Sequence, residues 1–299
     1  MTDQSSHIPV MLKETIEHLN LRPGATIVDC TLGLGGHSAS IADKIGASGR
    51  LVCIDRDYAA LSLAREKLKG LPCTFHFVQA DFRNMNEALA TLKIPGVDGI
   101  LFDLGLSSFQ LNDPKRGFSF NADGPLDMRM DQDSHISAYD LVNSLSEREL
   151  SLILKNFGEE RWHHRIAKYL VVQREKHPID STRELSDTII KAIPARFRHQ
   201  KMHAATRSFQ ALRIAVNREL ESLEKALSAC LEYLNPEGRI CVIAFHSLED
   251  RIVKEKFRNW AHAGQMKLIT KKPLRPTEEE VAENSRSRSA RLRVAQKNG

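Results

Sequence analysis

The chain has 299 residues, of which 41% are hydrophobic, and a formal net charge of +5. This is enough apolar material for one large domain with an insertion or for two domains. No apolar run approaches the ~20 residues that cross a bilayer, and the first residues carry no apolar signal core, so we expect a soluble, cytoplasmic protein that is not bound to a membrane.

The five cysteines are scattered along the chain, without a Cys-x-x-Cys pair. This spacing argues against a disulfide framework and a zinc site, and we expect no metal. Cys30, Cys53 and Cys241 lie inside apolar runs, which is typical of small residues in a core.

The first hundred residues alternate between short apolar runs and helical segments. Four of the apolar runs end in an aspartate, at residues 26–29, 50–55, 75–81 and 97–103. Helical spacing of apolar residues is found over 37–45 and 59–68. Strands that alternate with helices predict right-handed βαβ units and a parallel sheet, so the expected fold class is α/β.

The alternation stops at Ser107, and no convincing buried strand follows up to Ala205. Helices are expected in this stretch, over residues 141–157, 161–176 and 182–193. The α/β pattern then resumes, with expected elements in chain order: a long amphipathic helix over 206–234, a fifth strand over 239–245, a helix over 248–260, and an antiparallel pair at 267–270 and 290–295. Residues 271–289 are expected to form a mobile loop. We therefore expect one domain made of residues 1–107 and 206–299, and an inserted helical domain of residues 108–205.

Aspartates lie at the ends of four expected strands: Asp29, Asp55, Asp81 and Asp103. In an open parallel sheet, ligands bind beyond the carboxyl ends of the strands. A single aspartate in such a place is more often a turn or cap residue, but four together favour a ligand site.

The glycine-rich turn over residues 29–37 lets the backbone approach a ligand closely. Asp55 follows Gly33 by 22 residues, and an acid in that place accepts hydrogen bonds from ribose hydroxyls, whether the ligand carries NAD or adenosine. Asp29 at the start of the turn would repel a pyrophosphate and attract a sulfonium cation. Asp81 and Phe82 provide an acceptor for an adenine amino group and a ring for its face, although Phe82 is equally well explained as a core residue. The sequence thus favours S-adenosylmethionine over NAD.

A basic stretch spans residues 191–218 and contains no acidic residue. Its basic residues are Lys191, Arg196, Arg198, His199, Lys201, His203, Arg207, Arg213 and Arg218. Although a run of charge is usually a solvated face, this one-sided composition favours phosphate binding.

The sequence resembles the bacterial 16S ribosomal RNA cytosine-N4 methyltransferases, the MraW/RsmH family. The motifs that carry the resemblance span nearly the whole chain: His7 to Glu14 (HIPVMLKE), Gly33 to His37 (GLGGH), Leu101 to Ser108 (LFDLGLSS), Arg116 to Phe120 (RGFSF), Gly124 to Met130 (GPLDMRM), Phe157 to Arg161 (FGEER), Ala205 to Ala211 (ATRSFQA), Phe245 to Arg251 (FHSLEDR) and Asn284 to Val294. Several of these motifs are long and unusual.

The resemblance implies a class I, Rossmann-like methyltransferase fold with a mainly parallel sheet and an inserted small helical domain that recognises the substrate. It implies S-adenosyl-L-methionine as cofactor, with a site that maps onto Gly35, Gly36, His37, Asp55, Phe82, Asp103 and Gln110. The implied substrate is a cytidine in the decoding region of 16S rRNA, methylated on its exocyclic N4, and the implied partner is the small ribosomal subunit. Thr31 departs from the generic methyltransferase turn, which has a glycine there. The oligomeric state stays open, with a homodimer as one option.

Asp103 is the candidate catalytic residue, because an acceptor near the cytosine amino group orients its lone pair and later helps to remove a proton. A role in orienting the cofactor is equally compatible with its position. His246 is a second candidate, although a histidine beside a strand end is more often a packed or capping residue. Since a base must leave its stack to react, Phe118, Phe120 and Met128 are candidates to wedge or stack against it, and at least one of them is expected in the core of the insertion.

Two alternatives stay open from the sequence. A nicotinamide-dependent oxidoreductase on a similar sheet would bind NAD. A non-catalytic ribosome-assembly factor would bind RNA without methyl transfer.

Overall fold

The computed structural model describes residues 8–198 and 203–299. These residues form two compact units. The first unit runs up to Gly105 and resumes from Leu220 to Gly299, and the second unit is Leu106–Glu219. Among the described residues, no helix combines the length and the apolar character needed to cross a bilayer.

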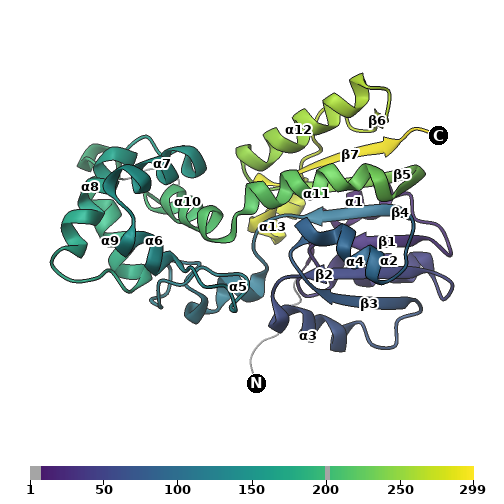
Figure 1. Cartoon of the computed structure of the whole chain (residues 1–299), viewed down its shortest axis with the longest axis horizontal. Coiled ribbons are helices and arrows are strands. Elements are labelled where there is room, and N and C mark those ends of the chain that lie inside the picture. Colours follow the sequence, from purple (N-terminus) through teal and green to yellow (C-terminus); the bar gives the residue numbers. More distant parts are fainter. Residues whose placement is uncertain (1–7, 199–202) are drawn as a thin grey trace. The chain divides into compact units, whose positions relative to one another are not determined.

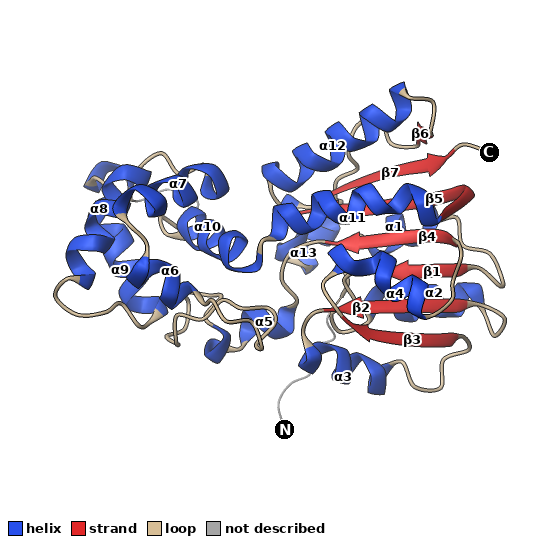
Figure 2. Cartoon of the chain, in the orientation of Figure 1, coloured by secondary structure: helices blue, strands red, loops and turns tan. Residues whose placement is uncertain are grey.

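The first unit contains one seven-stranded sheet, ordered β3-β2-β1-β4-β5-β7-β6 (Figures 1 and 2). Its strands are β1 (Thr26–Asp29), β2 (Arg50–Asp55), β3 (Thr74–Gln79), β4 (Val97–Asp103), β5 (Leu234–Ala244), β6 (Met266–Leu268) and β7 (Arg291–Lys297). The first five strands pair in parallel, whereas β7 is antiparallel to both β5 and β6. This arrangement confirms the expected class I methyltransferase fold, the five parallel strands and the closing antiparallel pair.

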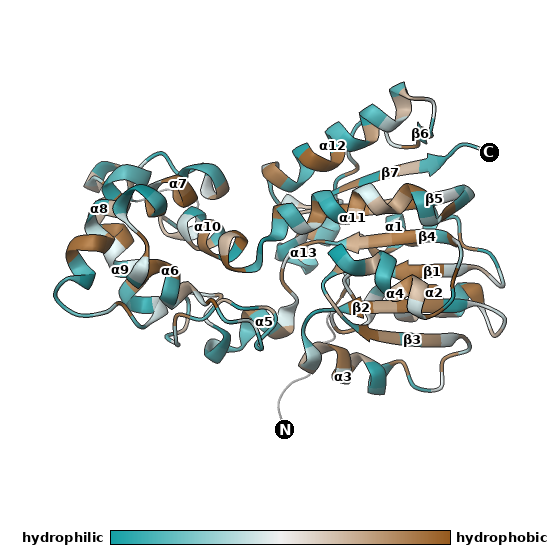
Figure 3. Ribbon diagram, viewed as in Figure 1, coloured by the Kyte–Doolittle hydropathy of each residue, from teal (hydrophilic) through white to brown (hydrophobic). Residues whose placement is uncertain are grey.

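The helices of the first unit cover both faces of the sheet. They are α1 (Leu12–His18), α2 (Gly36–Ile45), α3 (Tyr58–Lys67), α4 (Met85–Thr91), α11 (Glu219–Tyr233), α12 (Ser247–His262) and α13 (Glu278–Glu283), with short 3₁₀ turns at Phe82–Asn84 and Ser285–Ser289. Neighbouring residues of β1 belong to different hydrophobic clusters. Val28 belongs to the cluster that includes residues of α4, α11 and α12, whereas Ile27 belongs to the cluster that includes residues of α2 and α3. The apolar character of β1 and β4 (Figure 3) is what burial on both faces requires.

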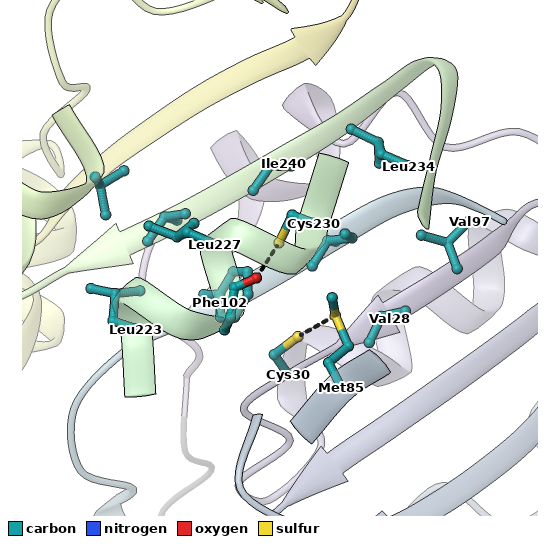
Figure 4. Packing of buried hydrophobic residues seen from close by; sticks show 14 of the residues in the cluster. Val28, Cys30, Met85, Val97, Phe102, Leu223, Leu227, Cys230, Leu234 and Ile240 are labelled. Carbon is teal, nitrogen blue, oxygen red and sulfur yellow. Dashed lines mark hydrogen bonds between the residues drawn. The ribbon is translucent and has the colours of Figure 1, made fainter. Parts of the chain in front are cut away.

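The core beneath α11 is built around Phe102, whose ring lies beside Leu223 and Leu227 of that helix (Figure 4). Two thiols make weak polar contacts in the same cluster: Cys30 with the sulfur of Met85 at 3.7 Å, and Cys230 with a carbonyl of its own helix at 3.3 Å. All five cysteines are free. The prediction that Cys30, Cys53 and Cys241 are core residues is therefore confirmed.

The second unit is helical, as expected. Its helices are α5 (Ser108–Asn112), α6 (Ala138–Ser144), α7 (Glu147–Gly158), α8 (His163–Arg174), α9 (Thr182–Ala192) and α10 (Thr206–Asn217), with 3₁₀ turns at Pro114–Arg116 and Ala195–Phe197. Its own hydrophobic core joins α6 to α10 with the segment around Phe118 to Met130. Between Leu106 and Glu219, the described residues form no strand beyond an isolated bridge of Pro125 with Ser181.

The structure corrects three of the expected elements. The helix expected over 141–157 is two helices, because Ser146 begins α7 with a capping box that it forms with Glu149. The helix expected over 206–234 is also two, because Arg218 takes a left-handed φ of 50° between α10 and α11. The segment 271–289, expected as a loop, contains α13 and a 3₁₀ turn.

The boundaries of the insertion also differ from those expected. Residues 206–219, which we had placed with the sheet, belong to the second unit. The reason is packing: Phe209 and Leu212 of α10 lie in the helical core, and the amide of Asn217 bonds the backbone at Met128 and Met130 over 2.8 Å each. At the other end, the second unit begins at Leu106 rather than at residue 108.

Candidate cofactor site

Three of the four strand-end acids lie where the sequence places them. Asp29, Asp55 and Asp103 are the last residues of β1, β2 and β4, and these strands are neighbours in the order β2-β1-β4. We call these three carboxyl groups the acidic edge. Asp81 does not end a strand, because β3 stops at Gln79, and Asp81 instead caps the short 3₁₀ turn that follows.

The glycine turn between β1 and α2 is fixed by Asp55. One carboxylate oxygen of Asp55 accepts the backbone N–H of Gly33 at 2.8 Å, and the other accepts the N–H of Asp57 at 2.9 Å. Each oxygen keeps a further lone pair for a ribose hydroxyl. Burial raises the pKa of Asp55, although these two backbone hydrogen bonds act to lower it.

Gly35 and Gly36 are required by the path of the turn. Gly35 has a left-handed φ of 72°, and a Cβ there would lie 3.1 Å from a methyl group of Leu68. A Cβ on Gly36 would collide with the ring of Pro9. At these two glycines the backbone of the turn carries no side chain that would keep a ligand away from it.

Asp29 is buried and bonded within the protein. Its oxygens accept the hydroxyl of Ser38 at 2.7 Å and the backbone N–H of Thr31 at 3.1 Å. Burial raises the pKa of Asp29 to about 6, against the lowering effect of Ser38. Asp29 thus contributes negative charge to the acidic edge, and its hydrogen bonds to Thr31 and Ser38 stabilise the glycine turn and the start of α2.

Asp103 is held by the residue that departs from the generic turn. The backbone N–H of Asp103 donates to the hydroxyl of Thr31 at 2.6 Å, and Oδ2 of Asp103 lies 3.6 Å from Nδ1 of His37. Among the described residues, Oδ1 of Asp103 is buried and has no hydrogen-bond partner. Burial, followed by the charges of Asp29 and Glu249, raises the pKa of Asp103 well above its ordinary value.

The structure does not support Asp81 as an open acceptor for adenine. Its Oδ2 lies 2.8 Å from Arg83 and 3.2 Å from Arg56, and it also accepts the hydroxyl of Ser222 at 3.1 Å. Burial acts to raise the pKa of Asp81, but the two guanidinium groups outweigh it and hold the pKa below its ordinary value. The carboxylate is committed to an ion-pair cluster.

Phe82 is half-buried, with an edge-to-face contact to Phe102 at 5.7 Å between ring centroids. The guanidinium of Arg56 lies over its ring, 5.5 Å from the centroid. Sequence reasoning missed Arg56, whose only signal is that it follows Asp55 directly.

Six of the seven expected cofactor residues belong to the first unit. Five of these lie together at the glycine turn and the strand ends beside it: Gly35, Gly36, His37, Asp55 and Asp103. The sixth, Phe82, follows β3. Gln110 belongs to the second unit, where it is buried in α5 and forms a capping box with Ser107. Sequence reasoning also missed Ser38 and Glu249, since a serine or glutamate within a helix gives no signal by itself.

His246 is a capping residue. Its Nδ1 accepts the backbone N–H of Glu249 at 3.3 Å, at the beginning of α12, and Nε2 lies 3.2 Å from the carboxylate of Glu249. The structure therefore favours a capping role for His246 over a catalytic role.

The aromatic candidates of the second unit are mainly core residues. Phe118 and Met128 are buried in its hydrophobic core. Phe120 is half-buried and stacks on the ring of His203 at 4.2 Å. The wedge hypothesis is therefore not supported for Phe118 or Met128.

The second unit contains a pocket of about 230 Å³ that combines aromatic and cationic side chains. Its lining residues are Glu160, Arg161, Trp162, Ile193, Phe197, His203, Ala204 and Arg207. Arg161 lies over both Trp162 and Phe197, at 5.3 and 5.5 Å from their ring centroids. Arg196 lies over the Phe197 ring at 4.8 Å.

The basic stretch is only partly available for a ligand. Arg213 forms a bidentate ion pair with Glu219, at 2.8 Å for each contact, so its charge is already paired. Arg207 lines the pocket and also donates to the carbonyl of Glu159. His199 and Lys201 lie outside the described residues.

Comparison with known proteins decides the family. The model of the MraW methylase family matches residues 4–298. The chain belongs to the MraW methylase family. Its relatives include proteins named ribosomal RNA small subunit methyltransferase H from Brevibacillus brevis, 47% identical over 97% of this chain and 98% of the relative, and from Carboxydothermus hydrogenoformans, 48% identical over 98% of each. Among solved structures, an rRNA methylase from Streptococcus thermophilus matches with a TM-score of 0.42 and 10% identity, covering 96% of this chain and 94% of that one.

Family membership confirms the predicted methyltransferase with S-adenosyl-L-methionine as its cofactor, in place of a nicotinamide-dependent oxidoreductase. The residues at the glycine turn fit this group chemically. The acidic edge suits a cation, and Asp55 retains lone pairs for a ribose.

Proposed function

We propose that this chain methylates the exocyclic N4 of a cytidine in the decoding region of 16S rRNA, within the small ribosomal subunit in the cytoplasm. The observation that carries the proposal is the acidic edge, which places three carboxyl groups beside a glycine turn. Support for the RNA substrate comes from the relatives named small subunit rRNA methyltransferase H, which match along 97% of the chain or more.

In the proposed site, Gly35, Gly36 and His37 bring the backbone to the cofactor, and Asp55 accepts its ribose hydroxyls. Phe82 packs on the adenine. The bound cofactor supplies an electrophilic methyl group on a cationic sulfur. These residues mainly position it, which accounts for much of the rate when the leaving group is good.

Asp103 is proposed to act on the acceptor. The lone pair of a cytosine amino group is delocalised into the ring, so the nitrogen is a poor nucleophile. As a carboxylate, Asp103 accepts a hydrogen bond from this N–H₂, which orients the lone pair toward the methyl group, and it then accepts a proton as the N–C bond forms. Its unpartnered Oδ1 is free of competing bonds within the described residues.

Methyl transfer with isotope-labelled cofactor tests the proposal. Free 16S rRNA and assembled small subunits that lack the modification are incubated with the protein, digested to nucleosides and analysed by mass spectrometry. We expect N4-methylcytidine within the decoding region. A methyl group on carbon 5 or on a ribose, or RNA binding without any transfer as for an assembly factor, would refute the proposal.

The second unit is proposed to hold the RNA through its aromatic–arginine pocket. Unpaired bases stack on aromatic rings and on guanidinium planes, and the pocket combines Trp162, Phe197 and His203 with Arg161 and Arg207. The buried core beneath it keeps these groups in place.

Replacing Arg161 with glutamine tests this surface. Because one phosphate-neutralising cation is removed, we expect weaker RNA binding at all sequences and a fall of about 0.7 in the slope of log affinity against log salt concentration. Filter binding at several salt concentrations measures it. Arg148→Gln, on the exposed face of α7, is the matched control and should leave the slope unchanged; equal slopes for both variants would exclude Arg161 from the interface.

A further inference from the structure

Two sequence motifs have no role in the proposed function. They are the first and the last of the motifs that carry the family resemblance, over residues 7–14 and 284–294. The described part of the first motif begins with residues 8–11, which lead into α1 and which we call the strap. The last motif follows directly on α13 and contains the 3₁₀ turn Ser285–Ser289. We call residues 278–289, which comprise α13 and this turn, the clamp.

The clamp holds the strap by two hydrogen bonds to its backbone. The N–H of Met11 donates to Oε1 of Glu280 at 2.7 Å, and Nδ2 of Asn284 donates to the carbonyl of Ile8 at 3.1 Å. Met11 takes a left-handed φ of 50°. A residue other than glycine keeps such a backbone only where its surroundings enforce it, and the bond from its N–H to Glu280 is one of the contacts that do so.

The strap also lies against the glycine turn. A Cβ on Gly36 would collide with the ring of Pro9, so this ring is in contact with the backbone of the turn. The carbonyl of Val10 accepts a hydrogen bond from Nε2 of His37 at 3.0 Å. Val10 is buried in the same hydrophobic cluster as Leu32, which belongs to the turn. The strap therefore connects the clamp to two of the expected cofactor residues.

We propose that the clamp positions the glycine turn for the cofactor by way of the strap, with Glu280 and Asn284 as positioning residues. The inference rests on the proposed cofactor site. A glycine backbone has more conformational freedom than any other, and a turn that loses this freedom only on binding has a lower affinity for its ligand. By holding the turn in advance, the clamp and the strap raise the affinity for S-adenosylmethionine.

Glu280→Ala tests the clamp. It leaves the N–H of Met11 without its acceptor, so we expect the affinity for S-adenosylmethionine to fall by about 3- to 10-fold, the range for the loss of one hydrogen bond. The KM for the cofactor should rise by a similar factor, whereas turnover at saturating cofactor should change far less. Calorimetry measures the affinity, and methyl-transfer assays measure KM and turnover. A fall in turnover with unchanged affinity would contradict the inference.

Two substitutions in α13 are the controls. Glu280→Gln keeps a side-chain oxygen that accepts the N–H of Met11, and it should therefore bind the cofactor nearly as well as the unmodified protein. Glu279→Ala, on the exposed side of α13, removes a neighbouring charge and should leave the affinity unchanged. Equal affinities of Glu280→Ala and Glu279→Ala would refute the clamp, and so would a glutamine variant as weak as the alanine variant.

Amide hydrogen exchange tests the coupling in the unmodified protein. If the strap favours cofactor binding, the bound cofactor favours the ordered strap by the same factor, because coupling between two sites is reciprocal. The amide hydrogen of Met11 should therefore exchange more slowly with saturating S-adenosylmethionine, as measured by NMR. The amide of Ala263, which ends α12, is the reference and should not respond. An unchanged exchange rate at Met11, or equal slowing at both amides, would overturn the inference.

Asp55→Ala distinguishes failure of the clamp from failure of the cofactor site. Loss of affinity in Asp55→Ala, together with normal affinity in Glu280→Ala, would leave the cofactor site standing and refute the clamp. Normal affinity in both variants would refute the site and the clamp together. Because calorimetry with S-adenosylmethionine needs no RNA, neither result bears on the proposed methylation of 16S rRNA.

Discussion

Asp103→Asn is expected to lower the turnover of methyl transfer by about 10²- to 10⁴-fold, the range for loss of a general base, while cofactor affinity changes far less. Asparagine has the same shape and keeps the backbone bond to Thr31, which involves only the N–H of residue 103. It cannot take up a proton. Single-turnover assays with labelled cofactor measure the chemical step, and calorimetry measures the affinity.

The control for Asp103→Asn is Asp43→Asn, an identical chemical change on the exposed face of α2 in the same unit. It should leave both quantities unchanged. Normal turnover of Asp103→Asn would mean that this residue is not a base. Loss of affinity with normal turnover of the bound complex would assign it to cofactor orientation alone.

Asp250→Ala is expected to reduce the free energy of unfolding of the first unit by about 3–5 kcal/mol, the usual cost of breaking a buried ion pair. Asp250 lies in the first turn of α12, and its oxygens accept Nε of Arg293 at 2.6 Å and a terminal nitrogen of Arg291 at 3.0 Å. Both arginines belong to β7. Alanine would leave the two guanidinium groups without their carboxylate partner in a partly buried site. It would also remove the side-chain bonds that connect α12 to β7.

Urea unfolding followed by tryptophan fluorescence measures this effect. The chain has two tryptophans, and Trp162→Phe leaves Trp260, on the same helix as Asp250, as the only reporter. Glu255→Ala, on the exposed side of α12, is the control and should change stability by less than about 0.5 kcal/mol. Equal changes in the free energy of unfolding for both substitutions would show that the ion pair does not stabilise the protein.

The contribution of Asp250 also has a defined pH dependence. Burial acts to raise its pKa, but Arg293 and Arg291 outweigh burial and hold the pKa below the ordinary value. A carboxyl whose pKa is lowered by folding stabilises the protein fully above its unfolded pKa, and loses that effect as the pH falls through the folded value. The difference between the variant and the unmodified protein should therefore persist at neutral pH and shrink only in strong acid.

The strand pattern was readable from the sequence because it depends on local chemistry. Short β-rich runs that end in acids placed Asp29, Asp55 and Asp103 correctly. Asp81 was wrongly predicted to end a strand, because the β-rich pattern continues beyond Gln79, where β3 stops. Its ion pairs with Arg56 and Arg83 are tertiary contacts, which the periodicity of the sequence does not show.

The limits of the helices were harder to predict. The apolar spacing of α10 continues into α11 through Arg218, and only the left-handed backbone of that residue separates them. Nothing in the spacing shows that α10 packs into the helical core while α11 packs on the sheet. The second boundary of the insertion was therefore placed too early, since it is fixed by tertiary packing and by the side-chain bonds of Asn217.

The hydroxyl of Thr31 changes how the central sheet ends. The ladder between β1 and β4 continues to the bond from the N–H of Cys30 to the carbonyl of Leu101, and the next N–H, that of Asp103, bonds to a side chain instead of a backbone carbonyl. A hydroxyl thus serves as the last rung, and the main chain is free to turn away one residue earlier than pairing would otherwise allow. Serine would preserve that rung, whereas valine, which has almost the same shape as threonine, would leave an amide without its acceptor at the edge of the sheet.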